Sequence, residues 1–211
     1  TVMESLAFDV ELIFVDDGSG DSTPGILKDF ARDDHRVILV RLSRNFGHQQ
    51  AITAGLGFCT GDAAVIMDGD LEDPPELIPS LLSKWQEGFK VVVAQRRSRQ
   101  ANAVRRFLIG AFYKLLHFLS DYPIPLHSGV FCLLDKRAYR QLLALTENNR
   151  FIPGLRAWVG FSATSVVFDR ERRHSGEPKQ TFWRLLKYGA DAIFSFSYKP
   201  LRISLFMGLV I

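Results

Sequence analysis

The stretch VIMDGDLEDPP, residues 65–75, places four acidic residues directly after an apolar run. Asp68 and Asp70 are spaced two apart, so in a turning segment their carboxylates can converge on one hard cation, with Glu72 as a candidate third ligand. Mg²⁺ prefers oxygen ligands and usually bridges phosphates. A solvated surface turn is the alternative, but neighbouring carboxylates repel one another unless they are neutralised. The spacing therefore favours a Mg²⁺ or Mn²⁺ site.

A second acidic pair, Asp16 and Asp17, is followed by Gly18 and Ser19. A carboxylate at the end of a strand can accept hydrogen bonds from a nucleotide base or ribose. A helix N-cap region rich in Asp and Ser is the alternative. Neither GxGxxG nor GxxxxGK[ST] follows, so the sequence supports neither a dinucleotide-binding fold nor a P-loop ATPase.

Arginines gather in two short segments, although the net charge of the 211-residue chain is only +3. That balance gives no sign of nucleic-acid binding. The planar guanidinium suits bidentate contacts with phosphate, while a solvated surface is the alternative for any single residue. The two groups consist of Arg96, Arg97, Arg99, Arg105 and Arg106, and of Arg170, Arg172, Arg173 and Lys179.

Strand and helix patterns alternate through the first half of the chain. We expect strands at 12–15, 37–42, 63–67 and 90–94, and helices at 24–30, 47–58 and 74–88. In the last of these helices, Asp73 with Pro74 and Pro75 is expected to form the start, where negative charge suits the dipole. Alternation of this kind predicts an α/β fold with a mostly parallel sheet and helices on both faces. Ligands bind at the carboxyl ends of such strands, where both acidic pairs are expected.

The second half is less regular. We expect a helix at 103–119, a strand at 130–134, a helix at 136–145 and a strand at 163–168. Residues 182–196 have the spacing of an amphipathic helix, which fits either a membrane interface or an ordinary surface. The uncharged run 203–211 is too short to span a bilayer, so it is either the start of a truncated transmembrane segment or a buried strand. We expect a catalytic domain at 1–180, a juxtamembrane helix and linker at 181–202, and further chain beyond both ends.

Five stretches occur in order along the chain: VDDGSGDST, RNFGHQQAITAGL, MDGDLEDPPE, VVVAQRR and RERRHSGEPKQ. Together they resemble the GT-A-fold family 2 glycosyltransferases, and within them the polyprenyl-phosphate branch of dolichyl-phosphate mannose synthase-like and bactoprenol glucosyltransferase-like enzymes. The closing FSFSYKPLRISLFMGLVI resembles the point where bacterial members enter their transmembrane helices. The resemblance covers nearly the whole chain.

The resemblance implies a role for individual residues. The acidic pair of the first strand would contact the nucleotide, the DxD carboxylates would hold the metal on the donor diphosphate, and an R-x-x-G-x-x-K loop would grip phosphates. By role, the implied residues are Asp70, Arg96 and Arg173 for catalysis; Asp16, Asp17, Ser19, Asn45 and Asp68 for the nucleotide; Asp68, Asp70 and Glu72 for the metal; and Arg97, Arg105, Arg106, Arg173 and Lys179 for the acceptor and diphosphate.

Three departures from the family pattern stand out. The Pro-x-Tyr-Asn-Glu segment of the first strand is absent, and Pro178 replaces a common Ser. Members often carry acidic residues in and before a Gly-x-Phe strand, followed by Arg, where this chain has Leu126, Val130 and Cys132. Val130 cannot act as a general base, and His127 is a possible substitute. A phosphate monoester has a second pKa near ~6, however, so an acceptor phosphate is already a nucleophile at neutral pH.

The expected function is inverting, metal-dependent transfer of a sugar from a nucleotide-sugar to polyprenyl phosphate. The donor would be UDP-glucose-like, with a GDP-sugar as the other possibility, and the acceptor undecaprenyl or dolichyl phosphate. The chain would act at the membrane, on its cytoplasmic face, and a homo-oligomer is one expected assembly. The alternatives are a family 2 transferase acting on a polysaccharide or protein hydroxyl, which would need a base, and a catalytically silent nucleotide-sugar-binding module.

Overall fold

The computed structural model describes residues 2, 4, 6–70, 72–96, 128–147 and 150–168. The expectations for a helix at 103–119, for the juxtamembrane helix within 181–202 and for the apolar run 203–211 lie outside these residues. Among the described helices, none is both long and apolar enough to cross a lipid bilayer.

The chain begins with a β-α-β unit. Strand β1 (Leu12–Asp16) pairs in parallel with β2 (Val37–Arg41), and helix α1 (Thr23–Asp33) connects them. Pro24 lies in the first turn of α1, where its missing N–H costs no helical hydrogen bond. These elements match the expected ones to within a few residues at their ends.

The second unit is a four-stranded sheet in the order β3-β5-β4-β6. Its strands are β3 (Ala63–Ile66), β4 (Val91–Arg96), β5 (Ser128–Asp135) and β6 (Ala163–Phe168). Its helices are α2 (His48–Phe58), α3 (Ile78–Gln86), α5 (Lys136–Ala144) and α6 (Ile152–Trp158), and a single 3₁₀ turn, η2 (Pro75–Leu77), precedes α3. The helix expected at 74–88 is thus divided into η2 and α3.

The expectation of a mostly parallel sheet needs correction. Strand β5 runs antiparallel to both of its neighbours, β3 and β4, whereas β4 pairs in parallel with β6. The sheet is therefore mixed. Alternation of strands and helices could not reveal this, because β5 follows β4 in the chain across residues 97–127 and is inserted between β3 and β4 in space.

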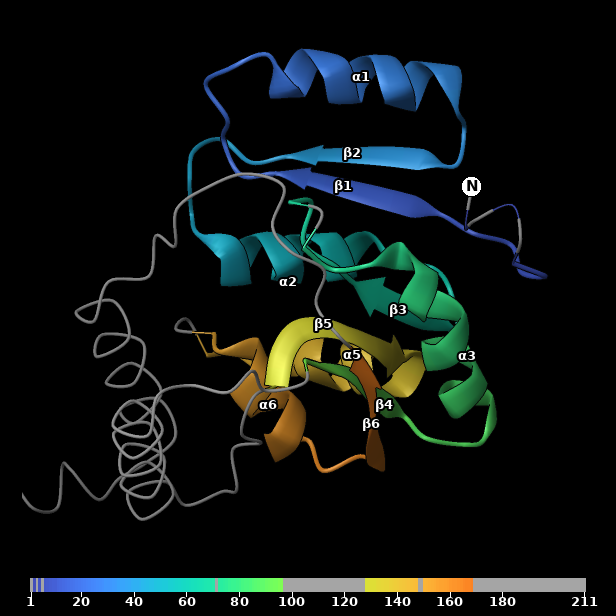
Figure 1. The fold of residues 1–211 in the computed structure, drawn as a ribbon. Coiled ribbons are helices and arrows are strands. Elements are labelled where there is room, and N and C mark those ends of the chain that lie inside the picture. Colours follow the sequence, from blue (N-terminus) through green and yellow to red (C-terminus); the bar gives the residue numbers. More distant parts are fainter. Residues whose placement is uncertain are drawn as a thin grey trace, which may run out of the picture.

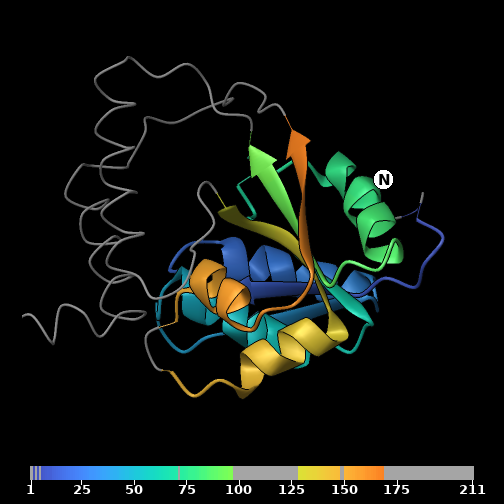
Figure 2. The same ribbon diagram turned by 90° about the horizontal axis from the view of Figure 1, so that it is seen from below.

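Helices cover both faces of the four-stranded sheet, as expected (Figure 1). Along β5, Cys132 and Leu134 face a core shared with α2, α5 and α6, while Phe131 and Leu133 face a second core shared with α3. Figure 2 shows α3 on one side of β4 and β6, with α5 and α6 on the other. Burial on both faces explains the almost uninterrupted apolar sequence of β5.

Helix α2 joins the two units. Within the described residues no strand pairing connects β1 to β3, and the sheets remain separate. A Cβ at Gly55 would lie 2.9 Å from the side chain of Val15, so α2 packs closely on β1. Leu56 of the same helix packs with Ala64 and Ile66 of β3. Helix α2 is thereby packed between β1 and β3.

Candidate active site

The two acidic pairs lie at the carboxyl ends of β1 and β3, as the sequence predicted. Asp16 is the last residue of β1 and Asp17 follows it, while Asp68 and Asp70 follow the end of β3 at Ile66. Hydrogen bonds and ion pairs then connect these ends through the first turn of α2 and the end of β4.

Asp17 shapes the loop that leads into α2. Its Oδ1 accepts a hydrogen bond from the backbone N–H of Phe46 at 2.8 Å, and its Oδ2 accepts one from the N–H of Gly47 at 2.9 Å. Gly47 has a φ of 97°, a conformation that favours glycine. Asp17 was predicted as a nucleotide contact, and in this structure both of its carboxylate oxygens hold backbone amides of the loop.

Gly18 is required by its surroundings. Its φ is 73°, and a Cβ at this position would lie 2.5 Å from the carbonyl carbon of Arg44 and 2.7 Å from the backbone nitrogen of Asn45. The two loops that carry Ser19 and Asn45 therefore meet backbone to backbone. This close approach brings the two predicted nucleotide contacts together.

Asp16 is a buried carboxylate with part of its hydrogen-bonding capacity unused. Oδ1 accepts from the N–H of Ser19 at 2.9 Å, and Arg41 Nε lies 3.4 Å from Oδ2. Hydrogen bonds from the Ser19 hydroxyl and N–H lower the pKa of the Asp16 carboxyl despite its burial. Oδ2 has no hydrogen-bond partner within the described part of the chain. A buried acceptor in this state fits a polar ligand at the end of β1.

His48, the first residue of α2, contacts the DxD segment. Its Nε2 lies 2.8 Å from Oδ1 of Asp68, so the imidazole donates to the carboxylate. This hydrogen bond raises the pKa of His48 and lowers the pKa of Asp68. No role for His48 is predicted from the sequence, because no metal-ligand spacing surrounds it; only its position directly after Gly47, at the start of the helix, marks it.

Asp73 joins the DxD segment to β4. Its side chain is only 2 % exposed, and its Oδ1 accepts from Arg96 at 2.7 Å. Its Oδ2 lies 3.5 Å from the backbone N–H of Asp68. The interpretation of Asp73 as the start of a helix is therefore incomplete, since η2 begins only at Pro75. The ion pair holds Asp73 at the end of β4, and the longer contact brings it next to the backbone of Asp68.

Glu72 also faces Arg96, with its Oε2 3.6 Å from the guanidinium. Asp70 is engaged locally, since its Oδ1 accepts from the N–H of Glu72 at 3.0 Å. The carboxylates of Asp68 and Asp70 supply oxygen donors of the kind that Mg²⁺ or Mn²⁺ prefers. Within the described residues no three acidic, His or Cys side chains converge as a metal cage. The metal role of Asp68 and Asp70 remains a prediction, and the predicted third ligand, Glu72, is paired with Arg96.

The start of β5 lies at the same edge of the sheet. Val130 is half-buried and packs against the core formed with α2, α5 and α6, so its side chain belongs to the packing. At Cys132 burial raises the thiol pKa, against the opposing effect of the nearby Arg156 guanidinium. Arg156, on α6, also contacts the carbonyl of Gly129. The position where family members were expected to carry Arg is therefore approached by an arginine from another element.

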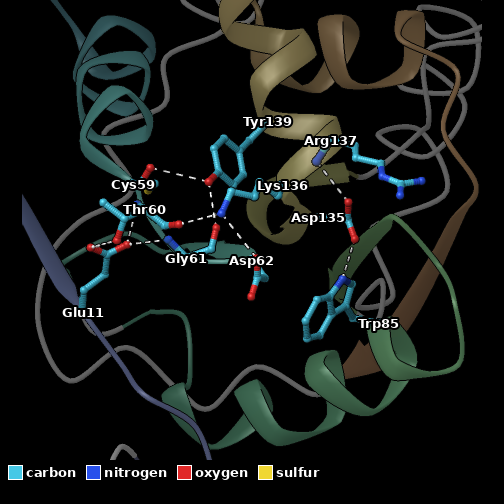
Figure 3. Close-up of polar contacts among 10 residues, drawn as sticks. All are labelled: Glu11, Cys59, Thr60, Gly61, Asp62, Trp85, Asp135, Lys136, Arg137 and Tyr139. Atoms are coloured by element: carbon cyan, nitrogen blue, oxygen red, sulfur yellow. Dashed lines mark hydrogen bonds and ion pairs between the residues drawn. The ribbon is translucent and has the colours of Figure 1, made fainter.

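The opposite edge of the sheet holds a structural network (Figure 3). Glu11 accepts from the backbone N–H groups of Thr60 and Gly61 at 2.8 and 3.0 Å, and Tyr139 donates to the carbonyl of Gly61 at 2.8 Å. Asp135 caps α5 and accepts from Trp85 Nε1 and Lys90 Nζ, both at 2.9 Å. A cavity of about 290 Å³ beside Asp135 lies at this end. It is thus separated from the acidic pairs by the length of β3.

The predicted acceptor and phosphate contacts Arg97, Arg105, Arg106, Arg173 and Lys179 lie outside the described residues. The predicted contacts Asp16, Asp17, Ser19, Asn45, Asp68, Asp70, Glu72 and Arg96 lie at one edge of the molecule, and their binding roles remain predictions.

Comparison with known sequences identifies the family. The glycosyl transferase family 2 description matches residues 2–143. The chain belongs to glycosyl transferase family 2. An uncharacterized glycosyltransferase of Synechocystis sp. is 41 % identical over 211 residues, which is 100 % of this chain and 66 % of that protein. A bactoprenol glucosyl transferase of Shigella phage SfX is 37 % identical over 205 residues, or 97 % of this chain and 67 % of that protein. This family 2 chain thus spans about two thirds of the length of these relatives.

A solved structure shares the fold of this family 2 chain. The mannosyltransferase PcManGT of Pyrobaculum calidifontis, in complex with GDP-Man and Mn²⁺, superposes with a TM-score of 0.52 at 20 % identity. The match covers 84 % of this chain and 51 % of that one. At this identity the likeness establishes a GT-A-like α/β fold alone.

Proposed function

We propose that the protein transfers a sugar from a nucleotide-sugar to polyprenyl phosphate, with inversion at the anomeric carbon and with a divalent cation. The observation that carries the proposal is the linked edge of the molecule. Asp17 holds the loop before α2, His48 of α2 contacts Asp68, and Asp73 binds Arg96 and makes a longer contact of 3.5 Å to the Asp68 backbone. These contacts hold the carboxylates proposed for the nucleotide and those proposed for the cation at the same edge of the molecule.

The donor is proposed to bind along the ends of β1 and β3. The buried Oδ2 of Asp16 is an acceptor suited to a base N–H or a ribose hydroxyl. Relatives named bactoprenol glucosyl transferase favour glucose as the sugar, and the fold neighbour was solved with GDP-Man. We propose a UDP-glucose-like donor, with the competition between UDP and GDP as a direct test of the base.

Mg²⁺ or Mn²⁺ would be held by Asp68 and Asp70. When bound, such a cation neutralises charge that develops on the leaving diphosphate. Two features of the chain fit it: the oxygen donors spaced two apart, and the hydrogen bond of His48 that orients the Asp68 carboxylate. The fold neighbour's Mn²⁺ is consistent with this choice of cation.

The acceptor chemistry removes the need for a general base. A phosphate monoester is mostly dianionic at neutral pH, since its second pKa is about 6. Its oxygen attacks the anomeric carbon while the bond to the diphosphate breaks, and no proton has to be removed. Positioning is then the larger task for the protein. The packing of Val130 into the core is consistent with this chemistry and disfavours transfer to a hydroxyl, which would require a base.

The membrane expectation forms part of the proposal. A polyprenyl-phosphate acceptor resides in a bilayer, so we propose that the full-length protein works at the cytoplasmic face through residues 181–202 and the segment that begins at 203–211. Separation of the protein between membrane and soluble fractions, with and without residues 181–211, tests this part alone.

The main test uses the full-length protein and two measurements. Calorimetry with UDP or GDP and Mn²⁺ measures donor-side binding, and a radiolabelled-sugar assay with undecaprenyl phosphate measures transfer. Binding together with lipid-linked product supports the proposal. Binding without transfer to any acceptor would identify a silent nucleotide-sugar-binding module, which the apolar Val130 favours as the second candidate. Transfer to a polysaccharide or protein but not to lipid phosphate would overturn the proposal that polyprenyl phosphate is the acceptor.

A further inference from the structure

Two arginines are buried in the described part of the chain, and their contacts differ. Arg150 donates from one nitrogen to the carbonyls of Leu142 and Leu145, both at 2.7 Å, so it caps the end of α5, while its Nε has no partner among the described residues. Arg156 of α6 is only 4 % exposed, and its two terminal nitrogens each lie 3.4 Å from the carbonyl oxygen of Gly129, while the guanidinium also contacts the thiol of Cys132. Good N–H···O bonds are about 2.7–3.2 Å long. The contacts of Arg156 to Gly129 are therefore long, and its described partners are neutral groups.

The charge of Arg156 also lacks a counterion among the described residues. No carboxylate of the described residues forms an ion pair with Arg156, and the same holds for Arg150, which two short bonds to carbonyls hold instead. The more exposed Arg36, Arg41 and Arg96 each have an ion pair. Its neighbour Cys132 stays a neutral thiol, because burial raises the thiol pKa. A guanidinium remains protonated in proteins, and a buried charge without a partner is strongly unfavourable. The described residues around Arg156 therefore include no anion that could balance its charge.

The Arg156 guanidinium lies at the edge of the sheet that carries the acidic residues. The β3–β5 ladder ends with Ile66 opposite Cys132, so the start of β5 continues beside the segment that carries Asp68 and Asp70. Helix α6 is tied to the same edge, because Gln49, next to His48, accepts from the N–H of Ile152 at 2.8 Å. The guanidinium therefore belongs to the candidate active site and not to the opposite, structural edge.

Gly129 provides access to this guanidinium. It is exposed, and a Cβ built on it would meet nothing among the described residues closer than the Phe131 nitrogen at 3.9 Å. An oxyanion that enters beside Gly129 can replace the two long contacts to its carbonyl with short, charge-assisted hydrogen bonds. The planar fork of arginine matches two oxygens of one phosphate.

We propose that Arg156 binds the phosphate of the acceptor at the start of β5. This inference rests on the proposed function, since it names the group that holds the second substrate. A cation at Asp68 and Asp70 can serve the donor diphosphate, but a second phosphate that enters the same site needs a positive partner of its own. Arg156 supplies that charge at the start of β5, next to Gly129.

The test measures binding and does not require turnover. Full-length protein in detergent is titrated with farnesyl phosphate, a short prenyl phosphate, and separately with UDP and Mn²⁺. Arg156→Met keeps much of the side-chain length but removes the charge. It is expected to weaken the affinity for farnesyl phosphate at least about tenfold, the effect of one lost charge-assisted hydrogen bond. UDP binding should change less than about twofold on the same scale. Arg156→Lys should retain part of the affinity, because the charge remains but the fork is lost.

Arg150→Met is the matched control, since it removes a buried arginine that caps α5. It should lower the melting temperature and leave the affinity for farnesyl phosphate unchanged. If Arg156→Met behaves like Arg150→Met, Arg156 is a structural clamp and the inference is overturned. Weakened UDP binding with unchanged farnesyl phosphate binding would assign the residue to the donor diphosphate instead, and also overturns it. If Arg156→Met fails to fold, the affinities of Arg156→Lys for farnesyl phosphate and for UDP distinguish the same outcomes.

Failure of the proposed function gives a different result. Wild-type protein that binds farnesyl phosphate through Arg156 but forms no lipid-linked sugar would refute the proposed reaction and leave the Arg156 site intact. Inorganic phosphate distinguishes the lipid from its headgroup: competition with farnesyl phosphate in the wild type, absent in Arg156→Met, shows that the phosphate itself is recognised.

Discussion

Nε2 of His48 lies 2.8 Å from Oδ1 of Asp68, and this contact joins the first turn of α2 to the end of β3. It brings together two segments that are distant in sequence and fixes the orientation of the first carboxylate of the DxD segment. It also couples the protonation states of the two side chains, which makes the contact measurable.

The first prediction concerns the titration of His48. The hydrogen bond to Asp68 raises the pKa of His48 above its ordinary value of 6.5. Charged His48 therefore stabilises the fold fully below about pH 6.5, and this contribution is lost as the pH rises through the higher folded value. NMR titration of the metal-free protein should show the raised pKa, and Asp68→Asn should bring it down. An unchanged His48 pKa in Asp68→Asn would contradict the contact, and Asp62→Asn serves as the control for a distant charge.

The second prediction concerns the ion pair between Asp73 and Arg96. Asp73→Asn should lower the free energy of unfolding by about 1–3 kcal/mol, because a buried charged hydrogen bond is lost and Arg96 keeps an unmatched donor. Urea denaturation measures the change. The exposed pair Lys84–Glu87 is the control, and Glu87→Gln should cost about 0–1 kcal/mol. A double-mutant cycle that finds no coupling between Asp73 and Arg96 would remove Asp73 from the site framework.

The third prediction uses two neighbouring glycines. Gly18→Ala must adopt a positive φ and meets the backbone of Arg44 at 2.5 Å, so it should displace the loop and weaken UDP binding at least about tenfold. Gly20→Ala meets nothing within 4 Å and should bind UDP like the wild type. Calorimetry compares the two variants. Equal affinities would show that the approach of the two loops does not shape the nucleotide site.

The fourth prediction concerns acid stability. Hydrogen bonds from Ser19 lower the pKa of Asp16; at Asp135 burial works in the opposite direction, but bonds from Trp85 and Lys90 outweigh it and lower the pKa. Both carboxylates therefore stabilise the fold fully above their ordinary value of 3.8, and this stability is lost as the pH falls through the lower folded values. Urea unfolding between pH 3 and 7 should show the loss. The free energy of unfolding should depend less steeply on pH in Asp135→Asn than in the wild type. A slope equal to that of the wild type would argue against the network in Figure 3.

The fifth prediction concerns the cation. Asp70→Asn in the full-length protein should abolish Mn²⁺-dependent sugar transfer to lipid phosphate, because a hard cation loses a charged oxygen ligand. The radiolabelled-sugar assay gives the rate, and Asp62→Asn at the opposite end of β3 is the control. Undiminished turnover in Asp70→Asn would refute the metal assignment.

Much of the fold followed from sequence because local patterns specify single elements. The turn residues after Asp16 and the apolar run before Asp68 mark strand ends, and they correctly predict that the two acidic pairs lie at carboxyl ends. The direction of β5 could not be predicted in this way. A buried strand has the same apolar sequence whether its neighbours run parallel or antiparallel, so direction depends on the long connection before it.

The residues that hold the candidate site together were harder to predict than its carboxylates. The interaction of Asp73 with Arg96 is a contact between distant segments, and a carboxylate before two prolines has the local pattern of a helix start. Helix α6 was missed for a related reason, because its short apolar sequence, Ile152–Trp158, has burial without clear periodicity. Arg156 lies in that helix, so its role depends entirely on tertiary structure.

The separation of β1 and β2 from the four-stranded sheet has a consequence for cooperativity. Helix α1 has no buried residue, and in this unit only Asp16, Val37 and Val40 are buried, whereas β4 and β5 lie between two apolar cores. Amide hydrogens of β1 and β2 should therefore exchange through local opening at a lower free energy than those of β4 and β5. A nucleotide held by Asp16 and Asp17 would then slow exchange mainly in this unit. The half of the site with the least intrinsic stability is the half that its ligand would order.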